Sequence, residues 1–225
     1  MDGILIVDKP QGMTSHDVVD LVRKRFAIEK VGHAGTLDPM ATGVLVMLIG
    51  GFTKRSMLFA SDDKDYEGTL LLGSTSDTQD VCGRMTRSQG EVNFTNEEIR
   101  GVFNKFLGEI EQRVPMYSAV KFKGRKLYEL ARRGVSVKVP SRMVRIKKIE
   151  VTKISLPQVS FRLTCTKGTY VRQLASDIGD ALGSGACLSS LRRTRSGSFT
   201  IDEALTMEDL NRLSRSDLED KIKRS

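Results

Sequence analysis

The amino-acid sequence predicts one α+β domain over residues 1–225, with a mixed and mostly antiparallel central sheet flanked by helices and loops. Two observations support this fold class. Short apolar segments with the period-2 alternation of strands are interleaved with segments that repeat every 3.6 residues, as amphipathic helices do. The interleaving is too irregular for successive βαβ units, so a doubly wound parallel sheet is disfavoured.

The first third of the chain contains clear strand and helix signals. Strands are predicted in three apolar runs: Ile4 to Val7, Val44 to Ile49 and Tyr66 to Leu72. Thr14 and Asp17 have the spacing of a capping box, in which each side chain accepts a bond from the other residue's main-chain N–H, and this predicts a helix start. The helix would bury Val18, Val22 and Phe26 on one face.

The later part of the chain continues this mixture of strands and helices. A second capping box, Thr95 with Glu98, begins a helix with an apolar face of Ile99, Val102, Phe103, Phe106 and Leu107. Val159 to Cys165 alternates like a half-buried strand and precedes a helix over Val171 to Leu182. A last helix is expected to begin at Thr206, and a charged tail follows it.

Positive charge is concentrated in one window of the chain. The net charge is +8, but residues 113–148 hold twelve basic residues and the single acid Glu129, so this window carries +11 and the rest −3. Within it, Arg125 to Arg133 predicts a short helix ended by Gly134, inside an extended surface loop. The clustering favours a nucleic-acid partner, and the alternative is a solvated face that binds nothing.

Several other classes of protein are disfavoured by the sequence. Cys82, Cys165 and Cys187 form no CxxC pair and have no histidines at zinc-like spacing, so we expect no metal site and no disulfide framework. The glycine-rich segments lack the context of nucleotide-binding loops. No apolar stretch has the length of a membrane span or signal peptide. We therefore expect a cytoplasmic protein without a cofactor.

The segment Gly32 to Gly43 is the strongest candidate for chemistry. Its three glycines and a proline hold one histidine, two hydroxyls and the single acid Asp38 close together. One carboxylate cannot readily assemble a metal site or an acid/base pair, so Asp38 is expected to be a nucleophile, a general base or a structural cap of the turn before Pro39.

At this point the sequence resembles the bacterial tRNA pseudouridine synthase B (TruB) family. The resemblance covers nearly the whole chain and includes five motifs in order, of which the segment around Asp38 is the most specific. The other motifs are the opening Asp8 to Gly12 with Thr14 and Ser15, Tyr66 to Gly68, Val114 to Lys121, and Lys167 to Arg172, followed by Leu191 to Thr194.

The resemblance implies the pseudouridine synthase fold and isomerisation of uridine-55 in the T arm of tRNA. The glycosidic bond moves from N1 to C5, and the target base must leave its stack to reach the protein. By its place in the motif, Asp38 is similar to the family's nucleophile. It would attack either C1′ of the sugar or C6 of the base, and both alternatives stay open.

The resemblance also assigns roles to other residues. Arg172 would pair with Asp38, and Tyr66 would stack on the target base. Tyr170 and Leu188 would line the pocket. The alternatives are a structural salt bridge for Arg172 and plain core packing for the other three residues.

Further residues are expected to act on the RNA. His33 would occupy space in the T loop after the base leaves, and the alternative for it is a hydrogen-bonded loop histidine. Lys9 would support the floor of the site. The basic window, with Lys121 and Arg142, overlaps the family's RNA-gripping segment. The implied partner is the T arm of tRNA, with no metal, organic cofactor or membrane, and we expect a monomer.

Two departures from the family pattern affect these expectations. Pro115-Met116 stands where relatives often have two prolines, and the chain ends at Ser225, so we expect no C-terminal RNA-binding domain of PUA type. Two other functions remain as alternatives: a synthase that acts on another RNA, and an RNA-binding chaperone that folds tRNA.

Overall fold

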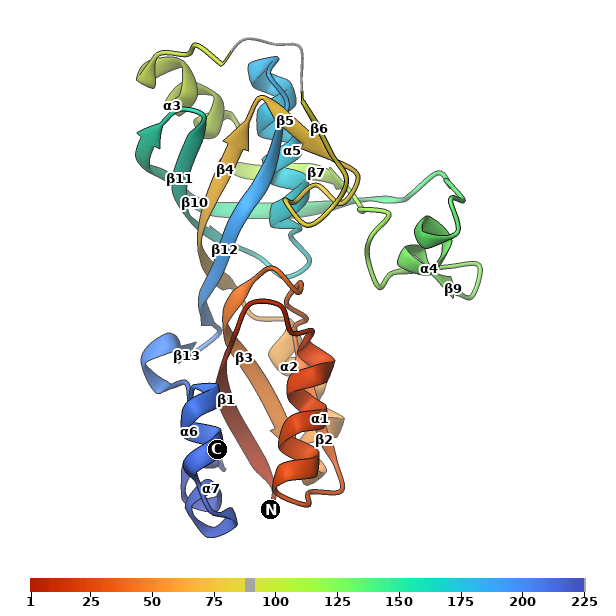
Figure 1. Ribbon diagram of the computed structural model, residues 1–225, viewed down its shortest axis with the longest axis vertical. Coiled ribbons are helices and arrows are strands. Elements are labelled where there is room, and N and C mark those ends of the chain that lie inside the picture. The colour runs from red at the N-terminus through yellow and green to blue at the C-terminus, as the bar shows by residue number, and fades with distance from the viewer. Residues whose placement is uncertain (88–91, 225) are drawn as a thin grey trace. The chain divides into compact units, whose positions relative to one another are not determined.

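The computed structural model describes residues 1–87 and 92–224, and the chain divides into two compact units. The first unit comprises Met1–Glu67 and Leu191–Ser225, and the second comprises Gly68–Ser190. Each unit contains both strands and helices (Figure 1), which confirms the predicted α+β class. Within the described ranges, no helix combines the length and apolar character needed to cross a membrane.

The first unit is built on strand β3, which pairs with its neighbours in both directions. β3 is antiparallel to β1 and β2, and it is parallel to the C-terminal part of β12 at Arg192 and Arg193. The strands of this unit are β1 (Gly3–Lys9), β2 (Val31–Ala34), β3 (Thr42–Ile49), β12 (Ala186–Ser196) and β13 (Phe199–Thr200). One parallel and several antiparallel pairings make the sheet mixed, as predicted.

Helices cover the sheet of the first unit. The helical segments are α1 (Ser15–Arg25), η1 (Gly50–Arg55), α2 (Ser56–Ala60), η2 (Ile201–Glu203), α6 (Met207–Arg212) and α7 (Arg215–Lys221). Val18, Val22 and Phe26 pack against the side chains of β1 and β3 that point to α1, which confirms the predicted helix face. The opposite face of β1 and β3 packs against Phe199.

The helix predicted to begin at Thr206 is present as α6, but it is not the last helix, because the charged tail predicted after it contains the helix α7. Leu218 of this helix is fully buried in the same core as α1. Ser214 and Asp217 form a capping box at its start, a signal that the dense charge around it concealed.

The second unit contains a sheet in the order β12-β4-β11-β10-β7. β4 (Lys64–Leu72) begins in the first unit and enters the second at Gly68. The remaining strands of the second unit are β5 (Ser74–Ser76), β6 (Met85–Arg87), β7 (Gly108–Arg113), β8 (Lys121–Phe122), β9 (Arg125–Lys126), β10 (Ser141–Ser155) and β11 (Gln158–Cys165). β10 is antiparallel to both β11 and β7. The helices are α3 (Asn96–Lys105), α4 (Leu127–Arg132) and α5 (Val171–Leu182). Phe103 of α3 and Phe161 of β11 meet with ring centroids 6.0 Å apart.

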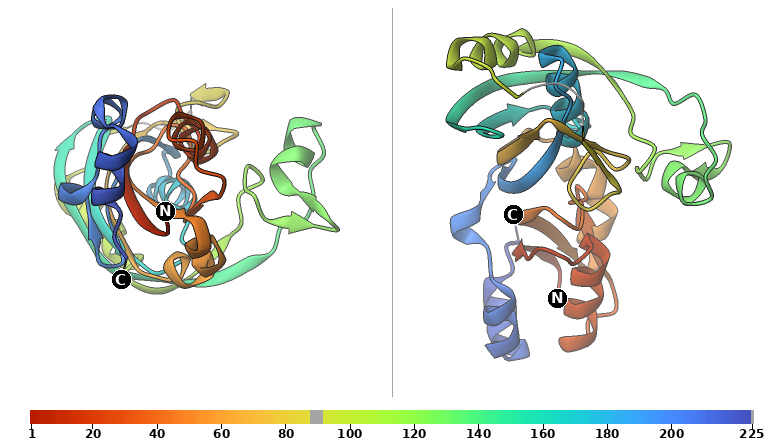
Figure 2. Two further views of the ribbon diagram at one scale, coloured as in Figure 1. Left: turned by 90° about the horizontal axis from the view of Figure 1, so that it is seen from below. Right: turned by 45° about the horizontal axis from the view of Figure 1, so that its top comes forward.

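Residues 113–148 differ from the predicted surface loop, because Ser141 onward lies in the long strand β10. Between β7 and β10 the chain forms a projection that carries β8, β9 and α4, away from the sheet of this unit in each view (Figures 1 and 2). Its core is a separate small cluster of Val114, Leu127 and Leu130. The short helix predicted over Arg125 to Arg133 is present as α4, but it begins at Leu127.

Candidate active site

The loop between β2 and β3 carries Asp38 and is fixed on both sides of that residue. Before it, the buried hydroxyl of Ser15 accepts a hydrogen bond from the Leu37 N–H (2.9 Å) and donates one to the Leu37 carbonyl (3.1 Å). After it, the N–H of Gly12 donates to the Pro39 carbonyl at 2.8 Å. The Asp38 side chain is half-buried. The loop thus presents one carboxylate from an anchored backbone.

Lys9 supports this loop from within the first unit. Its side chain is fully buried, and its ammonium donates to the carbonyls of Pro10 (2.9 Å), Met13 (2.6 Å) and Pro39 (3.4 Å). Burial lowers the pKa of Lys9 to about 8, against the opposing effect of the Asp38 charge. Lys9 thus connects the end of β1 to the loop that carries Asp38, and its role as a support of the active site stays a prediction.

His33 and Tyr66 belong to the same unit as Asp38. His33 lies on β2, and burial, followed by the positive charge of Arg193, lowers its pKa, which favours the neutral imidazole. Its Nδ1 is buried and has no hydrogen-bond partner within the described chain. Tyr66 lies on β4 with only 9% of its surface exposed. Their roles toward RNA stay predictions.

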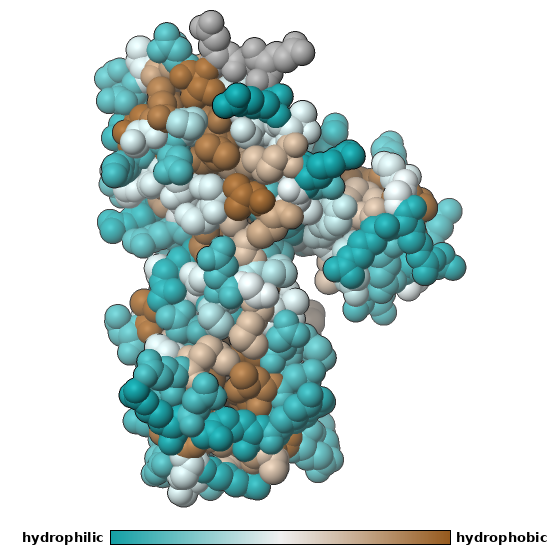
Figure 3. All heavy atoms as spheres, in the orientation of Figure 1, coloured by the Kyte–Doolittle hydropathy of each residue, from teal (hydrophilic) through white to brown (hydrophobic). Residues whose placement is uncertain are grey.

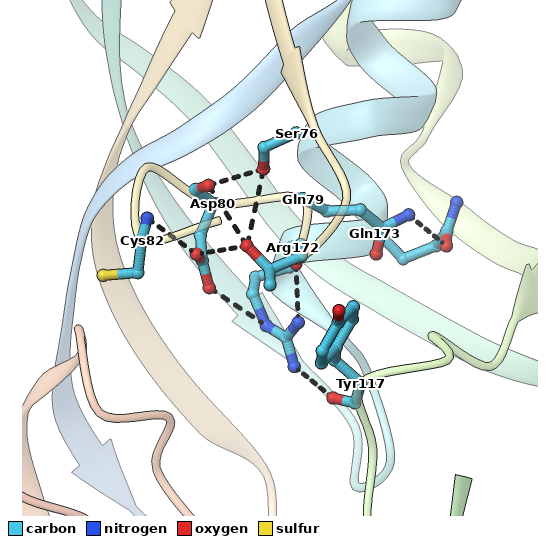
Figure 4. Close-up of polar contacts among 8 residues, drawn as sticks. Ser76, Gln79, Asp80, Cys82, Tyr117, Arg172 and Gln173 are labelled. Atoms are coloured by element: carbon cyan, nitrogen blue, oxygen red, sulfur yellow. Dashed lines mark hydrogen bonds and ion pairs between the residues drawn. The ribbon is translucent and has the colours of Figure 1, made fainter. Parts of the chain in front are cut away.

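In the second unit, Arg172 is held from three directions (Figure 4). It is the second residue of α5, and its guanidinium donates to the carbonyls of Thr78 (2.7 Å) and Tyr117 (2.9 Å). Its Nε lies 3.7 Å from the Asp80 carboxylate. Asp80 is itself fixed, because it accepts bonds from the Thr78 hydroxyl (2.7 Å) and the Cys82 N–H (3.0 Å).

Asp80 is not predicted by the sequence patterns. It lies in a polar turn without a recognisable motif, and its partner is 92 positions away in the chain. Asp38 and Arg172 belong to different units, so their pairing stays a prediction. Leu188 is fully buried in β12, where its main chain bonds to Gln79 and Val81 on either side of Asp80. The structure therefore places Leu188 beside the turn that holds Arg172.

Tyr170 joins the start of α5 to the basic projection. Its N–H donates to the Gln112 side-chain oxygen (3.0 Å), and its carbonyl accepts from the Gln112 amide nitrogen (3.2 Å). Gln112 is fully buried. The Arg142 guanidinium lies 4.3 Å from the centroid of the Tyr170 ring, and Tyr170 also packs against the core of the projection.

The basic residues of the window 113–148 are presented to solvent. All twelve are exposed except Lys126 and Arg142, which are partly buried, and Lys121 lies exposed on β8. The side of the projection that faces the viewer in Figure 3 is mostly hydrophilic. Exposed cations on an ordered scaffold can neutralise phosphates of a nucleic-acid backbone.

The site residues form two sets. The first unit holds a carboxylate on an anchored loop that is bonded to a buried ammonium, and the second unit holds an immobilised guanidinium. In residues 1–87 and 92–224, no group of three or more histidine, cysteine, aspartate or glutamate side chains could hold a metal ion.

Comparison with protein families gives two adjacent matches that span most of the chain. Residues 23–171 match the family described as TruB family pseudouridylate synthase, N-terminal domain, and residues 172–224 match the tRNA pseudouridylate synthase B C-terminal domain.

Individual relatives and solved structures agree with these matches. The chain is 46% identical over 222 residues to tRNA pseudouridine synthase B of Opitutus terrae, covering 99% of this chain and 92% of the relative. The protein of the same name from Syntrophus aciditrophicus is 49% identical over 211 residues, covering 93% and 67% respectively. Among solved structures, a chain of a Cbf5-Nop10-Gar1 complex is 35% identical with a TM-score of 0.73, covering 93% of this chain and 54% of that one.

Proposed function

The chain belongs to the TruB family of pseudouridylate synthases and is a tRNA pseudouridine synthase, and we propose that it isomerises uridine-55 in the T arm with Asp38 as the nucleophile. The observation that carries this proposal is the anchoring of the Asp38 loop by Ser15 and Gly12 on its two sides. A nucleophile gains rate from being held in one geometry, because less freedom is lost when the reaction begins.

The proposed reaction conserves all atoms of the nucleotide. The bond between C1′ and N1 breaks, a bond between C1′ and C5 forms, the C5 proton leaves and N1 gains a proton. Asp38 attacks C1′ or C6 and is released at the end. The target base must leave the RNA stack, which costs a few kcal/mol, and stacking on Tyr66 offsets part of that cost.

Arg172 is proposed to hold the Asp38 carboxylate ionised and aimed. A planar guanidinium can bind both carboxylate oxygens, whereas an ammonium acts as a point charge. The fixed carbonyl and carboxylate partners of Arg172 support this role, since they leave its side chain one orientation. Leu188 is proposed as the apolar wall of the base pocket, and Tyr170 as a residue beside it.

The RNA is proposed to bind through the basic projection and through His33. Lys121 and the other exposed cations contact phosphates, and Arg142, stacked on Tyr170, joins this surface to α5. A neutral His33 occupies the space left in the T loop by the displaced base. The enzyme is proposed to act as a monomer in the cytoplasm.

The substrate position can be tested with unmodified tRNA transcripts that carry tritium at C5 of uridine. The purified protein should release one equivalent of tritium per transcript, and pseudouridine should map to position 55. A matched transcript with cytidine at position 55 should release none. Release from that control, or pseudouridine mapped elsewhere, would show that the proposed target is wrong.

A further inference from the structure

Arg193 is a buried cation beneath the loop that carries Asp38. It lies on β12 with 1% of its surface exposed, in the same compact unit as the loop. Its Nε donates to the Val44 carbonyl at 2.7 Å, and one terminal nitrogen donates to the Gly35 carbonyl at 2.9 Å. Gly35 lies three residues before Asp38 and Val44 six residues after it, so one side chain connects both ends of the loop.

The main chain of Arg193 also contacts the end of the loop, at Gly43. Arg193 pairs with Gly43 in the parallel contact between β12 and β3. Gly43 has φ +100°, and a Cβ at this position would overlap the main-chain atoms of Arg193. A glycine at position 43 therefore lets β12 approach near enough for the guanidinium to reach under the loop.

The charge of Arg193 is not explained by fold stability. Its guanidinium takes part in no ion pair within the described part of the chain and is bonded to neutral carbonyls. Burying a cation without a counter-charge is costly, and apolar side chains often replace buried ionic groups without loss of stability. Its positive charge also contributes to the lowered pKa of His33 and of Lys9.

We propose that Arg193 is a positioning residue of the active site, which fixes the geometry of the Asp38 loop by binding the carbonyls at its two ends. This inference rests on the proposed role of Asp38 as nucleophile. Two hydrogen bonds from one rigid fork prevent the ends of the loop from separating. A lysine would keep the charge but cannot reproduce the fork.

The test compares Arg193→Lys and Arg193→Gln with Arg195→Gln. Arg195 also lies on β12, is partly exposed and bonds to Asp65 and the Gly197 carbonyl, so it controls for loss of a cation from this strand. Single-turnover rates are measured at saturating enzyme, together with the Kd for tRNA. We expect a rate at least tenfold lower for Arg193→Lys, and lower still for Arg193→Gln, with Kd within threefold. The control should stay within threefold in both.

Amide hydrogen exchange gives a second measurement that does not depend on activity. Residues 36–42 should exchange at least tenfold faster in both Arg193 variants, while α1 and β1 exchange as in the unchanged protein. If Arg193→Gln fails to fold, Arg193→Lys decides the outcome. Wild-type turnover or unchanged exchange in Arg193→Lys would overturn the inference.

The two proposals can fail separately. If Asp38→Asn is inactive and Arg193→Lys is fully active, only the positioning role proposed for Arg193 is wrong. If Asp38→Asn remains active, the nucleophile assignment falls, and the exchange result still reports whether Arg193 fixes the loop.

Discussion

The guanidinium of Arg172 lies 3.7 Å from the carboxylate of Asp80, and both side chains are buried. A buried ion pair is tolerated only when its other polar atoms are also satisfied. Here Thr78, Cys82 and Tyr117 provide those bonds. The Thr78 and Tyr117 carbonyls and the Asp80 carboxylate together hold Arg172, and Asp80 supplies the negative charge among these partners.

Asp80→Asn should reduce turnover without abolishing it. The amide keeps the size of the side chain but removes the negative charge beside Arg172, so the guanidinium keeps the Thr78 and Tyr117 carbonyls and loses the carboxylate beside its Nε. We expect a single-turnover rate about tenfold lower and a free energy of unfolding about 2 kcal/mol lower. Asp77→Asn, which changes an exposed carboxylate in the same turn, serves as the control. Equal effects of the two substitutions would contradict this role for Asp80.

Gln112→Glu should disturb the start of α5. The amide both accepts from and donates to the main chain of Tyr170, and a carboxylate can only accept, so one carbonyl loses its donor in a buried site. We expect a loss of about 1–3 kcal/mol in a urea unfolding experiment, together with slower turnover. The neighbouring exposed Glu111→Gln should change neither quantity. Unchanged stability and turnover in Gln112→Glu would argue that the two hydrogen bonds between Gln112 and Tyr170 do not hold the start of α5.

The low pKa of Lys9, about 8, predicts a pH-dependent stability. Below pH 8 Lys9 is protonated in both the folded and the unfolded state. Between pH 8 and its ordinary value of 10.5, the unfolded chain binds a proton that the folded protein does not, so stability must rise with pH. The free energy of unfolding, measured relative to Lys9→Met, should increase by as much as about 3 kcal/mol over this range. A flat difference would contradict the low pKa.

Salt dependence tests whether the projection binds phosphates. Replacing Lys121 and Lys123 by glutamine should lower the slope of log Kd against log salt concentration by about 0.7–0.9 for each phosphate that the variant no longer neutralises. Lys221→Gln, on α7 of the other unit, is the control for loss of one positive charge outside the projection, and its effect is compared with half the effect of the double replacement. If the control changed the slope by as much as that half, the binding surface would not be confined to residues 113–148.

The regular elements are predictable where local patterns are strong. β1, β3, β4 and β11 and the helices α1, α3 and α5 follow from apolar periodicity and capping boxes that act within a few residues. The predicted apolar face of α3 is wrong at its C-terminal end. Leu107 continues the apolar stripe of α3, but it follows the end of the helix and is 53% exposed.

Long-range pairings could not be predicted from local patterns. β12 is rich in serine and arginine and has the composition of a surface segment, yet it pairs with β3 and buries Arg193. Asp80 and Gln112 are functional candidates only because the fold brings them to α5. Asp38 is a candidate from the sequence alone because its motif is specific, and the structure adds that Ser15, at the start of α1, anchors the loop that carries it.

The central claim is that the Asp38 carboxylate attacks the nucleotide, and Asp38→Asn tests it most directly. The amide keeps the shape of the side chain and loses the nucleophile. The measurement is pseudouridine formed at position 55 in a single-turnover assay, with protein purified from cells that lack any endogenous enzyme of this activity. Asp20→Asn, in the surface ion pair of α1, is the control. We predict no detectable pseudouridine with Asp38→Asn, tRNA affinity within several-fold of the unchanged protein, and normal turnover in the control. Substantial pseudouridine formation by Asp38→Asn would contradict the account.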